Sequence, residues 1–252
     1  MLPVVPYCGT PPHPGELLAR FNLDPVLIAA LVGLTLAHLR HARAAHAAAR
    51  ERLVILAGWL TAALALVSPL CALSVALFAA RIGQHMVLIL IAAPLIALGL
   101  PPRRPKRRAT LLGCAAGAFF LLLWFWHMPV PYAATFASTP VYWTMHVTLF
   151  GSALLLWREI LYPSLEHGFE ALALGALTSM QMGLLGALLT LAERPMFVPH
   201  FTTTQAWGFT PLEDQQLGGV LMWVPGIALF LWALLRSLER LWRRIETARP
   251  AR

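Results

Sequence analysis

The stretch SVALFAARIGQHMVLILIAAPLIAL, from Ser74 to Leu98, decides the fold of this chain. Its apolar length exceeds the ~20 residues with which a helix crosses a lipid bilayer. Backbone N–H and C=O groups find no water in the bilayer core, so a single segment can satisfy them there only as a helix. The stretch therefore predicts a membrane-spanning helix.

The composition of the whole chain agrees with this prediction. Of the 252 residues, 59% are hydrophobic and 12% are charged, whereas a soluble domain is about 25% charged. So few charges cannot solvate a globular surface, and we predict an all-α, polytopic membrane bundle of about seven transmembrane helices. The predicted spans are Pro25 to Leu39, Leu53 to Val67, Ser74 to Leu98, Leu111 to Trp126, Val141 to Trp157, Phe169 to Leu191 and Leu217 to Leu235.

The basic residues are sorted to alternate connections between the predicted spans. All of the 19 Lys and Arg except Arg20, Arg81 and Arg194 lie in four segments. These are Arg40 to Arg52, Arg103 to Arg108, Arg158 to His167 and the tail from Arg236. Positive charge is retained on the cytoplasmic side, so we expect an outside N-terminus and a cytoplasmic C-terminus. The net charge of +8 then reflects topology and anionic lipid, with no nucleic acid as partner.

We expect one membrane-embedded helical domain over residues 1–252, located as a multi-pass protein in the cell (inner) membrane. Residues 1–24 form a proline-rich outer segment and residues 236–252 a basic cytoplasmic tail. Cys8 and Cys71 should both lie on the outer, oxidising side, where they could form a disulfide. A buried apolar thiol is the role we favour for each of them.

Three polar residues, Arg81, Gln84 and His85, interrupt the apolar zone of the third predicted span. Ionisable residues inside a membrane are costly and mark functional sites by default. Arg81 and His85 are four residues apart and share one helical face. A permanent cation nearby disfavours imidazolium, so His85 should be neutral, the form that binds metal. Alternatively, Arg81 snorkels outward and His85 hydrogen-bonds to a neighbouring helix.

Two further histidines adjoin methionines near the outer ends of predicted spans, in the pairs His127-Met128 and Met145-His146. Imidazole and thioether together suit copper, particularly Cu(I). Helix rise places His146 about 9 Å and His85 about 16 Å below the outer edge. We predict an outward-opening polar cavity lined by the three histidines. His127 and His146 could meet near its rim, and His85 joins them only if the helix boundaries move by a turn or more.

Three segments together resemble one protein family. They are QHM at 84–86, WHMP at 126–129, and DQQLGG at 214–219 followed by MWVPG at 222–226. Over about residues 68–235 the chain resembles the caa3-type cytochrome c oxidase assembly factors of the CtaG family. The resemblance implies a plasma-membrane protein needed to assemble an active haem-copper oxidase in the respiratory chain, with a role in copper delivery. It implies a protein without catalytic residues. Its partners would be oxidase subunits or copper chaperones.

The chemistry of the residues and the resemblance together give a candidate site, to which the resemblance contributes His85, His127, His146 and Asp214. The metal ligands would be His85, His127, His146 and Met128, with copper as the bound metal. Supporting residues would be Arg81, Gln84, Asp214, Gln215 and Met222. At Arg81 the chain departs from many relatives, which carry histidine there, and a guanidinium cannot replace a metal-binding imidazole. Two other functions fit the residues: a haem-binding electron-transfer protein with histidine ligands, and a transporter of a small solute or metal.

Overall fold

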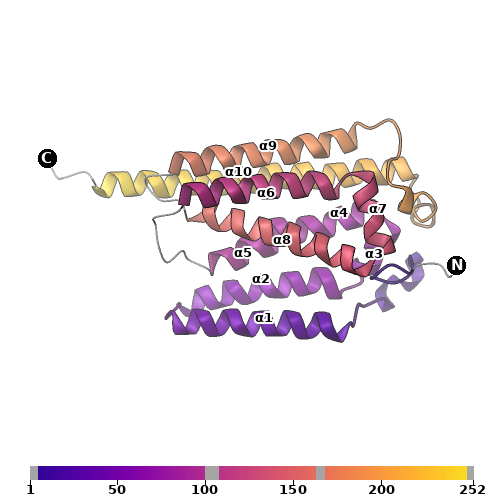
Figure 1. Ribbon diagram of the computed structural model, residues 1–252, viewed down its shortest axis with the longest axis horizontal. Coiled ribbons are helices and arrows are strands. Elements are labelled where there is room, and N and C mark those ends of the chain that lie inside the picture. Colours follow the sequence, from indigo (N-terminus) through magenta and orange to yellow (C-terminus); the bar gives the residue numbers. More distant parts are fainter. Residues whose placement is uncertain (1–4, 100–107, 163–167, 249–252) are drawn as a thin grey trace.

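The computed structural model describes residues 5–99, 108–162 and 168–248, and over these ranges it is helical without any strand (Figure 1). The predicted basic residues at 103–107, the connection at 163–167 and the last part of the tail, 249–252, lie outside the described residues. The elements are η1 (Pro14–Ala19), α1 (Pro25–Ala44), α2 (Ala49–Val67), α3 (Leu70–Ala76), α4 (Phe78–Met86), η2 (Val87–Ala92), α5 (Ala93–Leu98), α6 (Arg108–Trp126), α7 (Pro129–Ala137), α8 (Thr139–Leu161), α9 (Gly168–Thr190), η3 (Val198–His200), η4 (Gln205–Trp207) and α10 (Pro211–Ala248).

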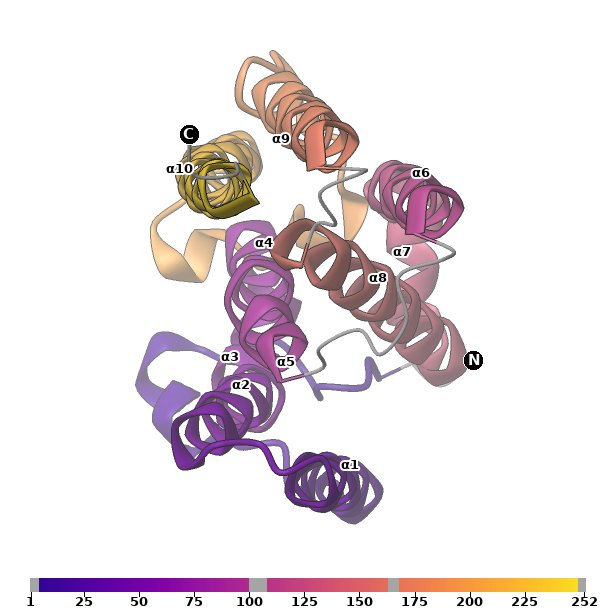
Figure 2. The ribbon, with the colours of Figure 1, turned by 90° about the vertical axis from the view of Figure 1, so that its left-hand side faces the viewer.

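The long helices run side by side along the longest axis of the molecule (Figure 1). Seen end on, α4 and α8 lie in the middle, with α1 and α2 on one side and α6, α9 and α10 on the other (Figure 2). Helices α4, η2 and α5 follow one another as a single rod, Phe78–Leu98. In the most apolar part of this rod 67% of the residues are buried, against 17% in the corresponding part of α1. The stretch that decides the fold is therefore also the centre of the bundle.

Among the described residues, four helices are long and apolar enough to cross a membrane, namely Pro25–Ala44, Phe78–Leu98, Gly168–Thr190 and Pro211–Arg243. Two bent pairs raise this number to six if each pair is one span: α2 with α3, bent by 46°, and α6 with α7, bent by 75°. The all-helical membrane fold expected from the sequence is thus observed, while the count of seven spans stays a prediction.

The third predicted span begins later than expected. Helix α3 ends at Ala76, Leu77 is extended with φ −125° and ψ 131°, and α4 begins at Phe78. The carboxylate of Asp214, in α10, accepts the backbone N–H groups of Phe78 and Ala79 at 2.6 and 3.0 Å. A carboxylate at a helix N-terminus satisfies unpaired donors and complements the helix dipole. Asp214 therefore caps α4, although it lies in the first turn of α10.

Glycines bring α10 close to its neighbours. A Cβ added at Gly218 would overlap the ring of Phe78, and one at Gly219 would overlap Thr190 and the backbone of Gly186. Small residues let membrane helices approach closely. This packing holds the carboxylate of Asp214 at the start of α4.

The two ends of the bundle differ in chemistry. At one end, which we call the disulfide end, Cys8 and Cys71 form a disulfide. This corrects our preference for separate buried thiols. The disulfide fastens the N-terminal segment beside α3. At the opposite end, which we call the arginine end, Arg50, Arg236 and Arg243 line a cavity.

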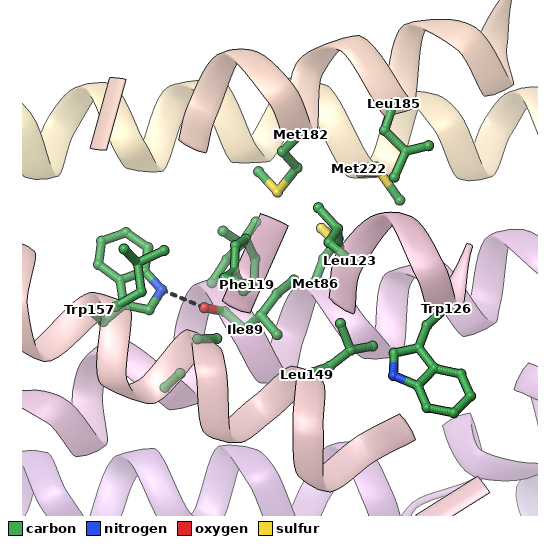
Figure 3. Close-up of a cluster of buried hydrophobic side chains, with 14 of the residues drawn as sticks. Met86, Ile89, Phe119, Leu123, Trp126, Leu149, Trp157, Met182, Leu185 and Met222 are labelled. Atoms are coloured by element: carbon green, nitrogen blue, oxygen red, sulfur yellow. Dashed lines mark hydrogen bonds between the residues drawn. The ribbon is translucent and has the colours of Figure 1, made fainter. Parts of the chain in front are cut away.

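An apolar cluster fills the bundle between the two ends (Figure 3). Its members are Met86, Ile89, Phe119, Leu123, Leu149, Met182, Leu185 and Met222. Beside it, the indole of Trp157 donates a hydrogen bond to the carbonyl oxygen of Ile89 at 2.6 Å. Ile89 lies in the π-helical turn η2, where the N–H of Ala93 donates to the carbonyl of Leu88. The next residue, Pro94, has no N–H to donate to the carbonyl of Ile89. The indole therefore satisfies an acceptor that would otherwise be buried without a partner.

Candidate functional site

Three buried imidazoles converge toward the disulfide end. His85 comes from α4, His127 from the bend between α6 and α7, and His146 from α8, and each is at most 5% exposed. The ring centroid of His85 lies 5.9 Å from that of His127 and 5.3 Å from that of His146. We call these residues the histidine cluster. His85 is thus the ring that contacts both others, because α4 begins about one turn later than the depth estimate assumed.

Backbone carbonyls orient two of these rings. Nδ1 of His127 lies 2.7 Å from the carbonyl oxygen of Leu123, and Nδ1 of His146 lies 3.0 Å from that of Tyr142. A carbonyl only accepts, so each Nδ1 must carry the proton and each Nε2 then keeps a lone pair. Hydrogen bonds of this kind fix the tautomer of metal-binding histidines.

The remaining ring nitrogens have no partner. Nε2 of His127, Nε2 of His146 and both ring nitrogens of His85 are buried without a hydrogen bond to any described residue. An unsatisfied buried polar group costs about 1–3 kcal/mol, so several together call for an explanation such as a ligand. Neutral imidazole nitrogens are good ligands for copper and zinc.

The cluster is not a finished coordination sphere. Among the described residues, no group of three or more His, Cys, Asp or Glu is close enough to hold a metal ion as it stands. Met128 is 50% exposed at the bend between α6 and α7, so its thioether lies outside the buried cluster. The arrangement offers convergent nitrogen donors that a small ion could draw together.

Arg81 is buried one helical turn before His85, at 1% exposure. Its guanidinium carbon lies 4.4 Å from the ring centroid of Phe136, 5.2 Å from that of Tyr132 and 5.4 Å from that of Tyr142. We call these three rings the aromatic cage. One guanidinium nitrogen donates to the hydroxyl of Thr135 at 2.6 Å. The aromatic faces attract the cation, so Arg81 is held inside the bundle and does not snorkel outward.

The predicted supporting residues mostly position helices. The amide of Gln84 donates to the carbonyl oxygen of Ala65 in α2 at 2.7 Å. Gln215 accepts the N–H of Met196 at 2.7 Å and so holds the loop before α10. Met222 is fully buried in the apolar cluster (Figure 3). Gln84 and Asp214 hold α4 in place. Within the described part of the chain, no hydrogen bond joins any of these four side chains to the three imidazoles.

Two histidines outside the cluster, His38 and His200, are buried as well. His200 is buried, and its Nε2 lies 2.7 Å from the hydroxyl of Tyr132. Burial lowers the pKa of His200 to about 3, so it is neutral at physiological pH. His38 is buried between the carbonyl of Gly99 and the indole of Trp59. Both serve packing between helices.

The aromatic cage was not predicted from the sequence. Tyr132 and Phe136 lie one turn apart on α7, and Tyr142 lies on the first turn of α8. The four-residue spacing of Tyr132 and Phe136 was the available signal, because it puts both rings on one face of a helix.

Fold and site together define a polytopic helical membrane protein with a buried cluster of unpartnered histidines at one end. The chain belongs to the cytochrome c oxidase caa3 assembly factor family, Caa3_CtaG, whose family model matches residues 31–244. This match confirms the resemblance inferred from the three sequence segments. Searches of curated proteins and of solved structures gave no match.

Proposed function

We propose that this protein is a non-enzymatic assembly factor that supplies copper, as Cu(I), to a haem-copper cytochrome c oxidase. The observation that carries the proposal is the convergence of three buried imidazoles whose free nitrogens have no described partner. Membership of the oxidase assembly family supplies the recipient. Copper is the cargo of this site, and oxidase subunits or a copper chaperone are its proposed partners.

The donor set suits a transient Cu(I) site. Imidazole is a good ligand for copper, and carbonyl hydrogen bonds at Nδ1 orient two of the rings. A carrier must also release its ion. Donors that converge without closing a coordination sphere fit this requirement, because less binding energy has to be overcome on transfer.

Two features support delivery from the outer side of the cell membrane, with the N-terminus outside and the C-terminus in the cytoplasm. Disulfides persist in oxidising compartments, and Cys8–Cys71 lies at the same end as the histidine cluster. The opposite end carries Arg50, Arg236 and Arg243, as expected of a cytoplasmic face. Charge and disulfide therefore favour the same orientation independently.

The haem alternative is not favoured. The rings of His85 and His146 meet edge to face, with centroids 5.3 Å apart. A porphyrin held between two axial imidazoles would have to separate these rings.

The cellular test measures the metal content of the oxidase. Oxidase purified from cells lacking this gene should be deficient in copper and should regain activity when the growth medium contains excess copper. A normal copper content in the purified oxidase would overturn the proposal.

The direct test titrates the full-length protein, in lipid nanodiscs, with Cu(I) against a chromophoric chelator. His127→Ala and His146→Ala should each weaken binding at least about tenfold, because each removes one donor. His13→Ala is the matched control, since His13 is exposed in the N-terminal segment. Unchanged affinity in both cluster variants would exclude the histidine cluster as the copper site.

A further inference from the structure

Arg81 is a buried cation without a counter-ion. It forms no ion pair within the described part of the chain, and its Nε has no hydrogen-bond partner there. The nearby carboxylate of Asp214 is taken up by the backbone N–H groups of Phe78 and Ala79. Burying an unpaired charge in a membrane is expensive, and packing alone would be served better by an apolar side chain.

The aromatic cage fixes the position of this charge. Three ring faces and the Thr135 hydroxyl surround the guanidinium. Arginine stays protonated in proteins, so the charge is permanent. It is therefore a constant feature of the site and not a switch.

The same cage connects the charge to the histidine cluster. The ring of Tyr142 lies 5.4 Å from the guanidinium carbon and 4.2 Å from the ring of His146. Arg81 also precedes His85 by one turn of α4. A metal ion held by the histidine cluster would lie near the guanidinium, with aromatic carbon and no described carboxylate between them.

The energetic consequence depends on the charge of the ion. The two distances through the Tyr142 ring place the guanidinium carbon within about 10 Å of the His146 ring. For a separation of this order and an effective dielectric constant of about 20, repulsion lowers affinity roughly tenfold for each unit of ion charge. A monovalent ion bears this penalty once and a divalent ion bears it twice.

We propose that Arg81 is a selectivity residue, which makes the histidine cluster favour monovalent Cu(I) over divalent ions such as Zn(II). This inference rests on the proposed function, because it concerns the metal that the same cluster binds. A relative with an uncharged residue at this position would lack the discrimination.

The test compares affinities for Cu(I) and for Zn(II), each measured on the full-length protein in lipid nanodiscs with a competing chelator. Arg81→Gln removes the charge and should raise Cu(I) affinity about tenfold and Zn(II) affinity about a hundredfold. The ratio of the two affinities should therefore fall about tenfold. Arg81→Met removes the charge without adding a polar group and should shift the ratio equally.

Two control variants separate charge from packing. Arg81→Lys keeps the positive charge and should keep the wild-type ratio even if both affinities change. Arg20→Gln removes an exposed arginine that pairs with Glu16, and both affinities should stay at their wild-type values.

Two outcomes would overturn the inference. If Arg81→Gln and Arg81→Met bind both metals with the wild-type ratio, Arg81 does not select by charge, although copper binding itself survives. If the wild-type protein binds neither ion, the proposed function fails and the selectivity proposal fails with it.

Discussion

Two buried clusters meet at consecutive residues of α4. His85 belongs to the histidine cluster, whose ring nitrogens have no described partner. Met86 belongs to the apolar cluster, where side chains from α6, α9 and α10 surround it (Figure 3). One cluster keeps ring nitrogens without a described partner, whereas the other consists mainly of side chains that need no hydrogen bond, and the indole of Trp157 beside it donates to the Ile89 carbonyl. Adjacent residues of one helix thus belong to a polar cluster and to a packing core.

This difference changes how the histidine–methionine pairs are interpreted. Neighbours on a helix point about 100° apart, so an adjacent imidazole and thioether cannot be paired ligands. In all three pairs the histidine enters the cluster. The methionines go elsewhere: Met86 and Met145 are buried in the core, and Met128 is half exposed. The structure brings the three histidines of these pairs together, while the thioethers beside them belong to packing or to the surface.

The largest effect is expected from the apolar cluster. Phe119→Ala should lower the free energy of unfolding by about 3–5 kcal/mol, because it leaves a cavity in a closely packed core. Unfolding by SDS in mixed micelles measures this change. The Cu(I) affinity of the folded fraction should stay unchanged. A loss of affinity as large as that of a histidine variant would show that the two clusters are not separable.

The next effect distinguishes the clusters at their boundary. His85→Leu should weaken Cu(I) binding at least about a hundredfold, because it removes the ring that contacts both others. It should not lower stability, since it replaces unsatisfied buried nitrogens with carbon. Met86→Leu, the control, should leave Cu(I) affinity unchanged and cost less than about 1.5 kcal/mol. A similar loss of Cu(I) affinity in His85→Leu and in Met86→Leu would contradict the separation of the histidine cluster from the apolar cluster.

The smallest effect concerns the residue that positions the histidine cluster. Asp214→Ala leaves two buried N–H groups at the start of α4 unsatisfied, at a cost of about 1–3 kcal/mol. It should weaken Cu(I) binding by less than His85→Leu. Asp214→Asn keeps an acceptor and should therefore lose less stability and less Cu(I) affinity than Asp214→Ala. Glu213→Ala is the control, because Glu213 is exposed and accepts only from Thr210. Equal losses in Asp214→Ala and Glu213→Ala would argue against a positioning role.

The sequence predicted the helical membrane class and the three histidines, because hydropathy and rare intramembrane polar residues are local signals. It could not predict that Asp214 caps α4 across 136 residues of separation, since only tertiary packing brings them together. For the same reason, the sequence could not decide between a Cys8–Cys71 disulfide and two separate buried thiols. The break at Leu77 was missed because the apolar stretch continues through it. That break placed His85 a turn closer to its partners than the depth estimate allowed.

The cap of Asp214 on α4 has a consequence for biosynthesis. Helix α4 leaves the ribosome early, yet the carboxylate that completes its first turn is translated only with the final helix. A nascent chain that stops short of Pro211 therefore contains all three cluster histidines but lacks the group that seats one of them. Competence to bind cargo would then await the synthesis of α10, and products truncated before it would be poor competitors for scarce metal.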